Sequence, residues 1–178
     1  MADPQEVAVV RPAPCVVRPG REAEIDELAQ MWAAMYAYQR AHGMVLALRD
    51  DAPEIWKRSL TGRLDSPVSV ILVAEAAPGG TGLAGFLAAQ IKRLPPHLSA
   101  ERGKVGFISE VYVDPAQRRH HIGQRLVDAA FAWFARAEVG SVELQVVIDN
   151  QAARAFWEKQ GFAAELVQMR ARLPGEPA

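Results

Sequence analysis

Apolar and polar residues recur along this chain with two different periods, and each period predicts one kind of element. Between positions 22 and 40 the apolar residues return every three or four positions, which is the spacing of one helix face. A second stretch of this kind has Pro53 in its first turn and breaks at Ser66-Pro67. We therefore expect two consecutive helices that each bury one side.

Four strands are predicted around these helices. Residues 15–18 form a short candidate before Pro19-Gly20, residues 68–76 are apolar and rich in β-branched side chains, and residues 83–92 return after a glycine-rich turn. Residues 104–113 alternate, and a period of two divides them between two faces. One face is predicted to hold Val105, Phe107, Val111 and Val113, and the other Ile108, Glu110 and Tyr112.

The second half of the chain predicts two more helices and two more strands. An apolar stripe starts a helix near Ile122, and Gly140 is predicted to end it. A strand over 142–148, a short helix capped by Asn150 and a last strand or hairpin arm over 162–173 follow. The order βααβββαβαβ predicts one α/β domain over 15–173, with a mixed sheet covered by helices, a loose leader over 1–14 and a tail over 174–178.

Composition excludes several classes of protein. Half of the 178 residues are hydrophobic, which is enough for one sizeable core. The net charge of −1 gives no general attraction to nucleic acid or to an anionic membrane, so an anion site has to be local. Cys15 is the single cysteine and cannot form an intrachain disulfide, which suits a reducing compartment. Without a secretory signal or a long apolar span, the protein is expected to be soluble and cytoplasmic.

A basic segment over 117–124 joins a predicted strand to the start of a strong helix. The first backbone N–H groups of a helix lack partners, and the helix dipole adds positive potential there. Arg118 and Arg119 at this end oppose the dipole unless an anion such as phosphate binds between them. A solvated basic turn explains the same residues equally well.

Glu110 is the ionisable residue that stands out on physical grounds, because it lies inside an apolar strand. A carboxylate kept from water has a raised pKa, which suits a general base for an ammonium group. A solvent-facing position or a salt bridge are the alternatives. Tyr112 shares that predicted face as a possible proton donor or as an ordinary packed tyrosine. The four histidines show no metal-ligand spacing, so no metal is predicted.

Two motifs resemble those of a known family. Val111-Tyr112-Val113-Asp114-Pro115 followed by Arg118-Arg119-His120-His121-Ile122-Gly123 resembles the strand and pyrophosphate loop, Q/R-x-x-G-x-G/A, of the GNAT superfamily of N-acetyltransferases. Residues 150–162 resemble its second motif, N-x-x-A-x-x-ϕ-Y-E-K-x-G-F, where ϕ is apolar, at the matching separation. The resemblance implies a mixed, mostly antiparallel twisted sheet flanked by helices, with acetyl-CoA as the co-substrate.

The resemblance also implies roles for single residues. The main chain of Val111 and Val113 is expected to pair with the pantetheine arm. Asn150 is expected beside the pantetheine or acetyl end, although its position equally predicts a helix N-cap. The first two helices flank the acceptor groove, so Trp32, Tyr36 and Tyr38 are expected either to wall it or to form core. The pyrophosphate loop is expected to comprise Arg118, Arg119, His120, His121, Ile122, Gly123 and Gln124.

Two residues depart from the family pattern. His121 stands where the loop has its first glycine. Because the loop binds through backbone N–H groups, a side chain there is tolerated if it points outward, and Gly123 still permits close approach of a ligand. Trp157 stands where the family often has a tyrosine that protonates the leaving thiolate. An indole N–H does not supply a proton at neutral pH, so Trp157 is expected to pack beside the cofactor without acting as the acid.

The leading hypothesis is an enzyme that moves an acetyl group from acetyl-CoA to a primary amine by direct attack, with Glu110 as the base. The acceptor is expected to be a small molecule or a peptide, with no nucleic acid or membrane partner and a possible homodimer. Trp157 and His121 favour the alternative, a non-catalytic acyl-CoA-binding sensor. A dinucleotide-binding fold is excluded, because no G-x-G-x-x-G follows a strand.

Overall fold

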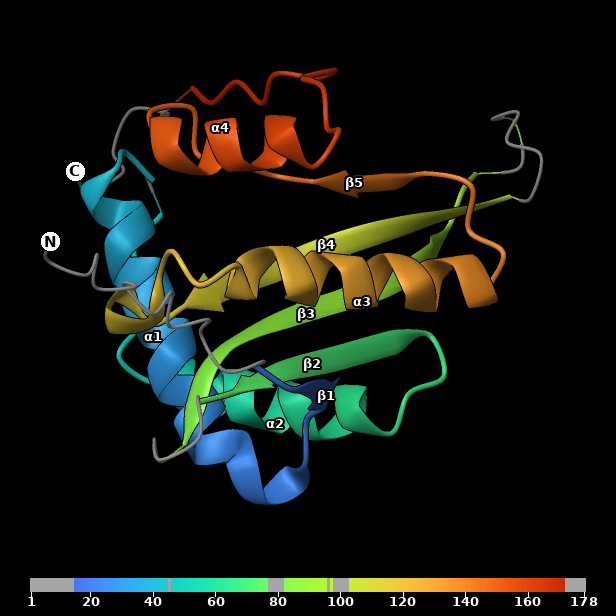
Figure 1. Cartoon of the computed structure of the whole chain (residues 1–178). Helices are drawn as coiled ribbons and strands as arrows, with labels where there is room; N and C mark the ends of the chain where they lie inside the picture. Colours follow the sequence, from blue (N-terminus) through green and yellow to red (C-terminus); the bar gives the residue numbers. More distant parts are fainter. Residues whose placement is uncertain (1–14, 45, 77–81, 96, 98–102, 172–178) are drawn as a thin grey trace, which may run out of the picture.

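A computed structural model describes residues 15–44, 46–76, 82–95, 97 and 103–171. Its centre is one sheet with the strand order β1-β2-β3-β4-β5 (Figure 1). The strands are β1 (Val17–Pro19), β2 (Ser69–Glu75), β3 (Leu83–Arg93), β4 (Lys104–Val113) and β5 (Val142–Leu144). The first four pair antiparallel and β5 runs parallel to β4. The predicted fold class, a mixed and mostly antiparallel sheet flanked by helices, is confirmed.

Helices cover both faces of this sheet (Figure 1). One face carries α1 (Ile25–Ala41), which follows a short 3-10 turn η1 (Glu22–Glu24), and α2 (Ala52–Leu64). The other carries α3 (Ile122–Arg136), which follows the turn η2 (Pro115–Gln117), while α4 (Gln151–Lys159) lies beside β5. Alternate residues of β2 and β3 serve the two faces: Ile71, Val73, Phe86 and Ala88 pack under α1 and α2, and Leu72, Ala74, Leu87 and Ala89 under α3.

Two predicted boundaries and one predicted strand are wrong. The helix α3 ends at Arg136, and the left-handed residue beyond it is Glu138 (φ 57°) rather than Gly140. The strand β5 stops at Leu144, four residues before the predicted end. Residues 162–171 form no strand; a strand needs a hydrogen-bonded neighbour, and no described segment pairs with them. The predicted leader and tail lie outside the described residues.

The strand β4 contains a bulge that changes which residues share a face. Ala89 pairs with Ile108 but the next residue, Ala88, pairs with Glu110, so Ser109 is an extra residue in the ladder. Glu110 and Tyr112 therefore share the face that α1 and α2 cover, and the prediction that these two residues lie on one face is confirmed. Ile108 faces α3 instead, and Val105 and Phe107 lie on the opposite face from Val111 and Val113. The predicted faces assumed an unbroken period of two, and the bulge shifts that period by one residue.

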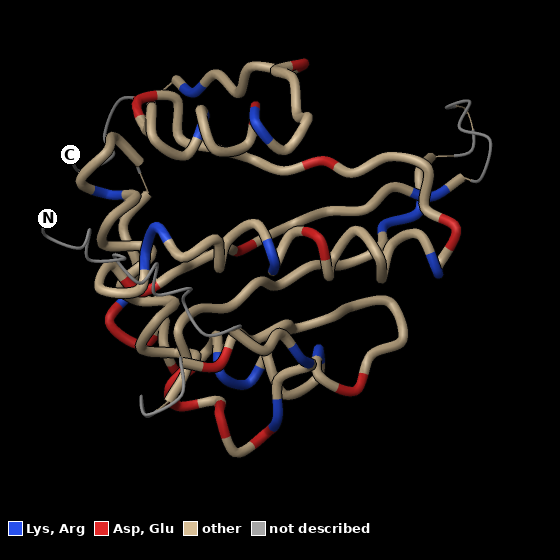
Figure 2. The backbone as a smooth tube through the Cα atoms, viewed as in Figure 1, with Lys and Arg blue, Asp and Glu red and all other residues tan. Residues whose placement is uncertain are grey.

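The parallel pair β4–β5 is short, and the two strands then separate. Only Gly106, Phe107 and Ile108 pair with β5, at Val142–Leu144. Beyond Ile108, no described strand pairs with this side of β4, which leaves its backbone N–H and C=O groups available. Lys and Arg residues are interspersed with Asp and Glu residues along the described chain (Figure 2).

Candidate active site

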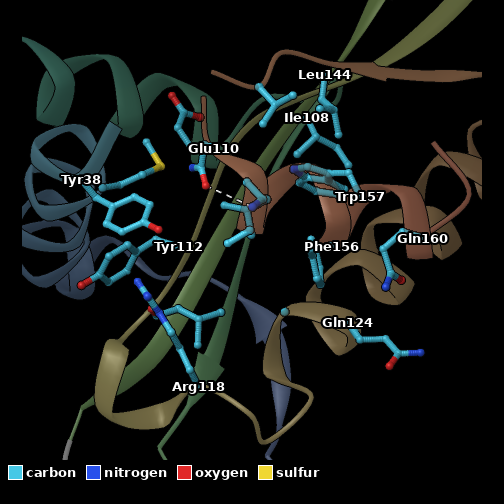
Figure 3. Close-up of a pocket in the computed structure, with 18 of the residues that line it drawn as sticks. Tyr38, Ile108, Glu110, Tyr112, Arg118, Gln124, Leu144, Phe156, Trp157 and Gln160 are labelled. Carbon is cyan, nitrogen blue, oxygen red and sulfur yellow. Dashed lines mark hydrogen bonds between the residues drawn. The ribbon is translucent and has the colours of Figure 1, made fainter. Parts of the chain in front are cut away.

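The separation of β4 and β5 opens a cleft of about 770 Å³. Its floor is residues 108–113 of β4, one side is the loop 117–119 with the first turn of α3, and the other is residues 144–147 with α4. The C-terminal half of α1 contributes Met35, Tyr38 and Gln39. Figure 3 shows Tyr38 and Tyr112 across the cleft from Phe156 and Trp157.

Segments far apart in sequence bring the predicted site residues to this cleft. Apart from His120, all of them line it: Glu110, Val111, Val113, Arg118, Arg119, His121, Ile122, Gly123, Gln124, Asn150 and Trp157. The ring nitrogen Nδ1 of His120 lies 3.2 Å from the carbonyl oxygen of Gln117, within the loop itself.

The loop before α3 has an unusual backbone conformation. Arg119 (φ 68°) and His121 (φ 59°) both adopt the left-handed conformation. For a non-glycine residue that conformation costs roughly 1–2 kcal/mol. Within the part of the chain that the structure describes, no acceptor lies opposite the N–H groups of residues 119–124, and the first helical bond runs from Arg125 to His121. These free donors at a helix N-terminus form a site suited to an anion.

His121 and Gly123 behave differently within this loop. His121 is an exposed residue that also lines the cleft, and its demanding feature is the left-handed backbone conformation. A Cβ on Gly123 would lie 3.3 Å from Cζ of Phe156 and 3.8 Å from Cγ2 of Val113. The bare Cα of Gly123 therefore lets α4 pack closely against the start of α3.

Glu110 is both a lining residue of the cleft and a partner in an ion pair. Its side chain is 11% exposed, and Nη1 and Nη2 of Arg63 in α2 both lie 3.3 Å from Oε2. The Ser109 hydroxyl also donates to Oε2, and Nη2 of Arg63 donates to Ser109 Oγ at 2.9 Å. Sequence reasoning missed Arg63 and Ser109: a basic residue in the last turn of a helix carries no sign of its distant partner.

Comparison with models of protein families shows where this chain belongs. The model of the Acetyltransferase (GNAT) family matches residues 25–162. The chain belongs to this family. No curated protein sequence shows detectable similarity to it.

Solved structures share the fold at low identity. A protein of Clostridium acetobutylicum described as a predicted acetyltransferase, solved with acetyl-CoA, is 16% identical with a TM-score of 0.74, over 89% of this chain and 96% of that one. A GCN5-related N-acetyltransferase of Ralstonia eutropha is 23% identical with a TM-score of 0.70, over 91% and 100%. An aminoglycoside N-acetyltransferase in complex with CoA is 16% identical with a TM-score of 0.69, over 93% and 99%.

The second GNAT motif packs α4 against the cleft. Oδ1 of Asn150, which is 6% exposed, accepts from the N–H of Ala153 at 3.1 Å, so the predicted N-cap is confirmed. Trp157 is 9% exposed and meets the rings of Phe156 and Phe162 edge-on, with centroids 5.0 and 5.2 Å away. Trp157 therefore fixes α4 in place while one edge of it reaches the cleft.

The structure separates the three aromatic residues of α1 into core and wall. Trp32 is core, stacked on Trp56 at 5.3 Å, and Tyr36 packs against the same cluster. Only Tyr38 lines the cleft. Burial raises the pKa of Tyr36, and the charge of Glu110 adds to this. Burial also raises the pKa of Tyr112, with a further rise from Asp114 that Arg118 opposes. Both phenols therefore keep their protons at neutral pH.

The described residues contain no cluster of three or more histidine, cysteine, aspartate or glutamate side chains that could hold a metal ion. No helix in that part of the chain is long and apolar enough to cross a membrane.

Proposed function

We propose that this GNAT-family chain binds acetyl-CoA in the cleft between β4 and β5 and transfers the acetyl group to a primary amine of a small molecule or peptide, in the cytoplasm. One observation carries the proposal: among the described residues, the N–H groups of 119–124 have no acceptor, and they follow β4, whose edge beyond Ile108 has no paired strand. The phosphates of acetyl-CoA match the N–H groups, and its extended pantetheine arm, which contains amides, matches the strand edge. Structural relatives with acetyl-CoA or CoA bound support the choice of co-substrate.

Each part of the cleft then has a role. The N–H groups of the loop, from Arg119 to Gln124, hold the pyrophosphate, and the helix dipole of α3 favours its charge. The main chain of Val111 and Val113 pairs with the pantetheine arm as an added strand would. Asn150 and Trp157 stand beside the arm on the α4 side. The cleft volume of about 770 Å³ falls within the range of ligand sites, about 300–1,000 Å³.

The reaction needs a base more than it needs an acid. Glu110, directly or through a water, takes a proton from the ammonium group, and the free amine forms a C–N bond to the thioester carbonyl carbon as the C–S bond breaks. A thiol with a pKa of about 8.5 is a fair leaving group as its thiolate. Cys15 is not among the cleft-lining residues, and its Sγ lies 3.3 Å from the carbonyl oxygen of Glu75. Since Cys15 is the only cysteine of the chain, we propose direct attack by the amine without a cysteine intermediate.

Calorimetry and thiol release test the proposal together. Acetyl-CoA and desulfo-CoA are both expected to bind, since the pyrophosphate contacts are common to them. At about 100 times the dissociation constant, either ligand should stabilise the fold by roughly 2.7 kcal/mol. Free thiol should then appear from acetyl-CoA with at least one member of an amine panel. If neither ligand binds, the proposal fails. Binding without turnover for any amine would favour the alternative, a non-catalytic acyl-CoA-binding sensor. Trp157, at the position where the family often has a tyrosine, is also consistent with that alternative.

A further inference from the structure

The side chain of Arg118 faces the side of the cleft that α1 lines, although its backbone belongs to the predicted pyrophosphate loop. Its Cζ lies 5.4 Å from the ring centroid of Tyr38 in α1, and its Nε donates to the Val113 carbonyl oxygen at 3.4 Å. In Figure 3 the guanidinium points toward Tyr38 and Tyr112 and away from Gln124 in the first turn of α3. The cation therefore lies on the wall where α1 meets β4.

This guanidinium has no acidic partner within the described part of the chain. The neighbouring carboxylate of Asp114 accepts from the N–H of Ala116 at 2.8 Å and forms no ion pair with Arg118 there. Glu110 already faces the guanidinium of Arg63. The described lining of the cleft contains one acidic residue, Glu110, and three basic residues, Arg118, Arg119 and Lys159. A polycationic acceptor would meet a net positive wall, whereas a ligand with one amine and one carboxylate would complement it.

Glu110 and Arg118 both line the cleft. Glu110 and Tyr112 stand two residues apart on the same face of β4, about 6.6 Å along the strand, and the Arg118 guanidinium lies beside Tyr112. An arginine fork binds a carboxylate through two parallel hydrogen bonds, and aromatic faces help to hold the guanidinium in place. Met35 and Tyr38 of α1 also line the cleft.

We propose that Arg118 is a specificity residue that binds the carboxylate of an amino-acid acceptor while Glu110 receives its ammonium group. This inference rests on the proposed acetyl transfer and narrows the acceptor to amino acids with an apolar side chain. It disfavours polyamines and aminoglycosides, which carry several cations.

Matched acceptors test the inference. The set comprises phenylalanine, phenylalaninamide and phenethylamine, with methionine and methioninamide as a second series; each has an amine and only the acids have a carboxylate. Loss of a charge-assisted pair should lower kcat/KM by about tenfold to a hundredfold from acid to amide. In Arg118→Gln this preference should disappear, and in Arg118→Lys it should be partly restored. Arg136→Gln is the control: it removes an exposed cation in the last turn of α3, outside the cleft lining, and the acid-to-amide ratio should stay as in wild type.

Calorimetry with acetyl-CoA identifies the competing role. If Arg118→Gln weakens acetyl-CoA binding and leaves the acid-to-amide ratio unchanged, the guanidinium serves the pyrophosphate and the inference is overturned. If the amides or phenethylamine match or exceed the acids in wild type, the inference is also overturned, while acetyl transfer to an amine stands. Absence of thiol release with every amine, polyamines included, would remove the proposed function itself and the inference with it.

Discussion

Arg63, in the last turn of α2, reaches the carboxylate of Glu110 on β4, and both of its terminal nitrogens lie 3.3 Å from the same oxygen, Oε2. The bulge at Ser109 makes this contact possible, because it leaves Glu110 on the face that α1 and α2 cover. The pair is mostly shielded from solvent, with side chains 19% and 11% exposed. The proposed base is thus held in one orientation beside the cleft.

Replacing Glu110 by glutamine should remove the base and keep the shape. General base catalysis typically contributes about 10² to 10⁴ in rate, so kcat should fall by an amount in this range. The low-pH limb of the rate profile should change, and acetyl-CoA affinity measured by calorimetry should stay the same. Full activity of Glu110→Gln at every pH would show that another group or bulk water deprotonates the amine.

Arg63 is predicted to act as a positioning residue. Arg63→Gln removes the charge, and losing hydrogen bonds to a charged group costs about 1–3 kcal/mol of stability. We expect kcat to fall, the pH profile to shift and the KM for acetyl-CoA to stay close to that of wild type. Arg63→Lys keeps the charge and should recover part of the rate. A variant that loses stability but keeps the wild-type kcat and pH profile would assign Arg63 a structural role only.

The strained loop residue His121 predicts a stabilising substitution. Glycine adopts the left-handed conformation without penalty, and after its entropic cost in the unfolded chain His121→Gly should stabilise the fold by about 0.5–1 kcal/mol. Acetyl-CoA affinity should be retained, since the contacts come from the backbone. His120→Gly is the matched control: φ of His120 is not positive, so glycine there should destabilise. Urea denaturation compares the two, and equal losses of stability would contradict the assignment.

Gly123 separates a ligand contact from a packing contact. Gly123→Val should lower acetyl-CoA affinity by tenfold or more, although valine is no worse than glycine in helix propensity. An added Cβ also presses on Phe156, so the double variant with Phe156→Leu relieves that contact. We expect calorimetry to show weak binding in both. Recovery in the double variant would mean that Gly123 serves packing alone, and normal binding by Gly123→Val would place the pyrophosphate elsewhere. Gly62→Val in α2, where nothing lies within 4 Å, is the control for fold stability.

Trp157 tests whether the chain works without the usual acid. Trp157→Tyr restores a phenol at the family position and should raise kcat or leave it unchanged. Trp157→Phe keeps a ring without a hydroxyl, so a gain specific to tyrosine would identify the proton donor. Trp157→Ala should cost about 3–5 kcal/mol, because the residue is buried among aromatic rings. A large loss of rate in Trp157→Tyr with an unchanged melting temperature would show that the indole itself is needed.

Local pattern alone was enough to predict most of the architecture. The bounds of β4 and the start of α3 fell at their predicted positions, and Pro53 lies in the first turn of α2 as predicted. Periodicity, proline and cap residues act over a few neighbouring positions, which is why these features were predictable. The N-cap of Asn150 and the loop before α3 were readable for the same reason. The strand or hairpin arm expected over 162–173 does not form over its described part, 162–171, because strand formation depends on a partner that local pattern does not reveal.

The sequence by itself determined the fold class, the family and the segments that meet at the cleft, because these depend on local periodicity and on two motifs at a set separation. Only the tertiary structure decided that Ser109 is a bulge, that Glu110 is paired with Arg63 47 residues earlier, and that Arg118 lies over Tyr38. The bulge depends on how β3 pairs with β4, and the other two contacts depend on how α1 and α2 pack against the sheet. Such long-range contacts decide which charged side chains lie together at the cleft. The sequence pattern alone could therefore not predict the acceptor.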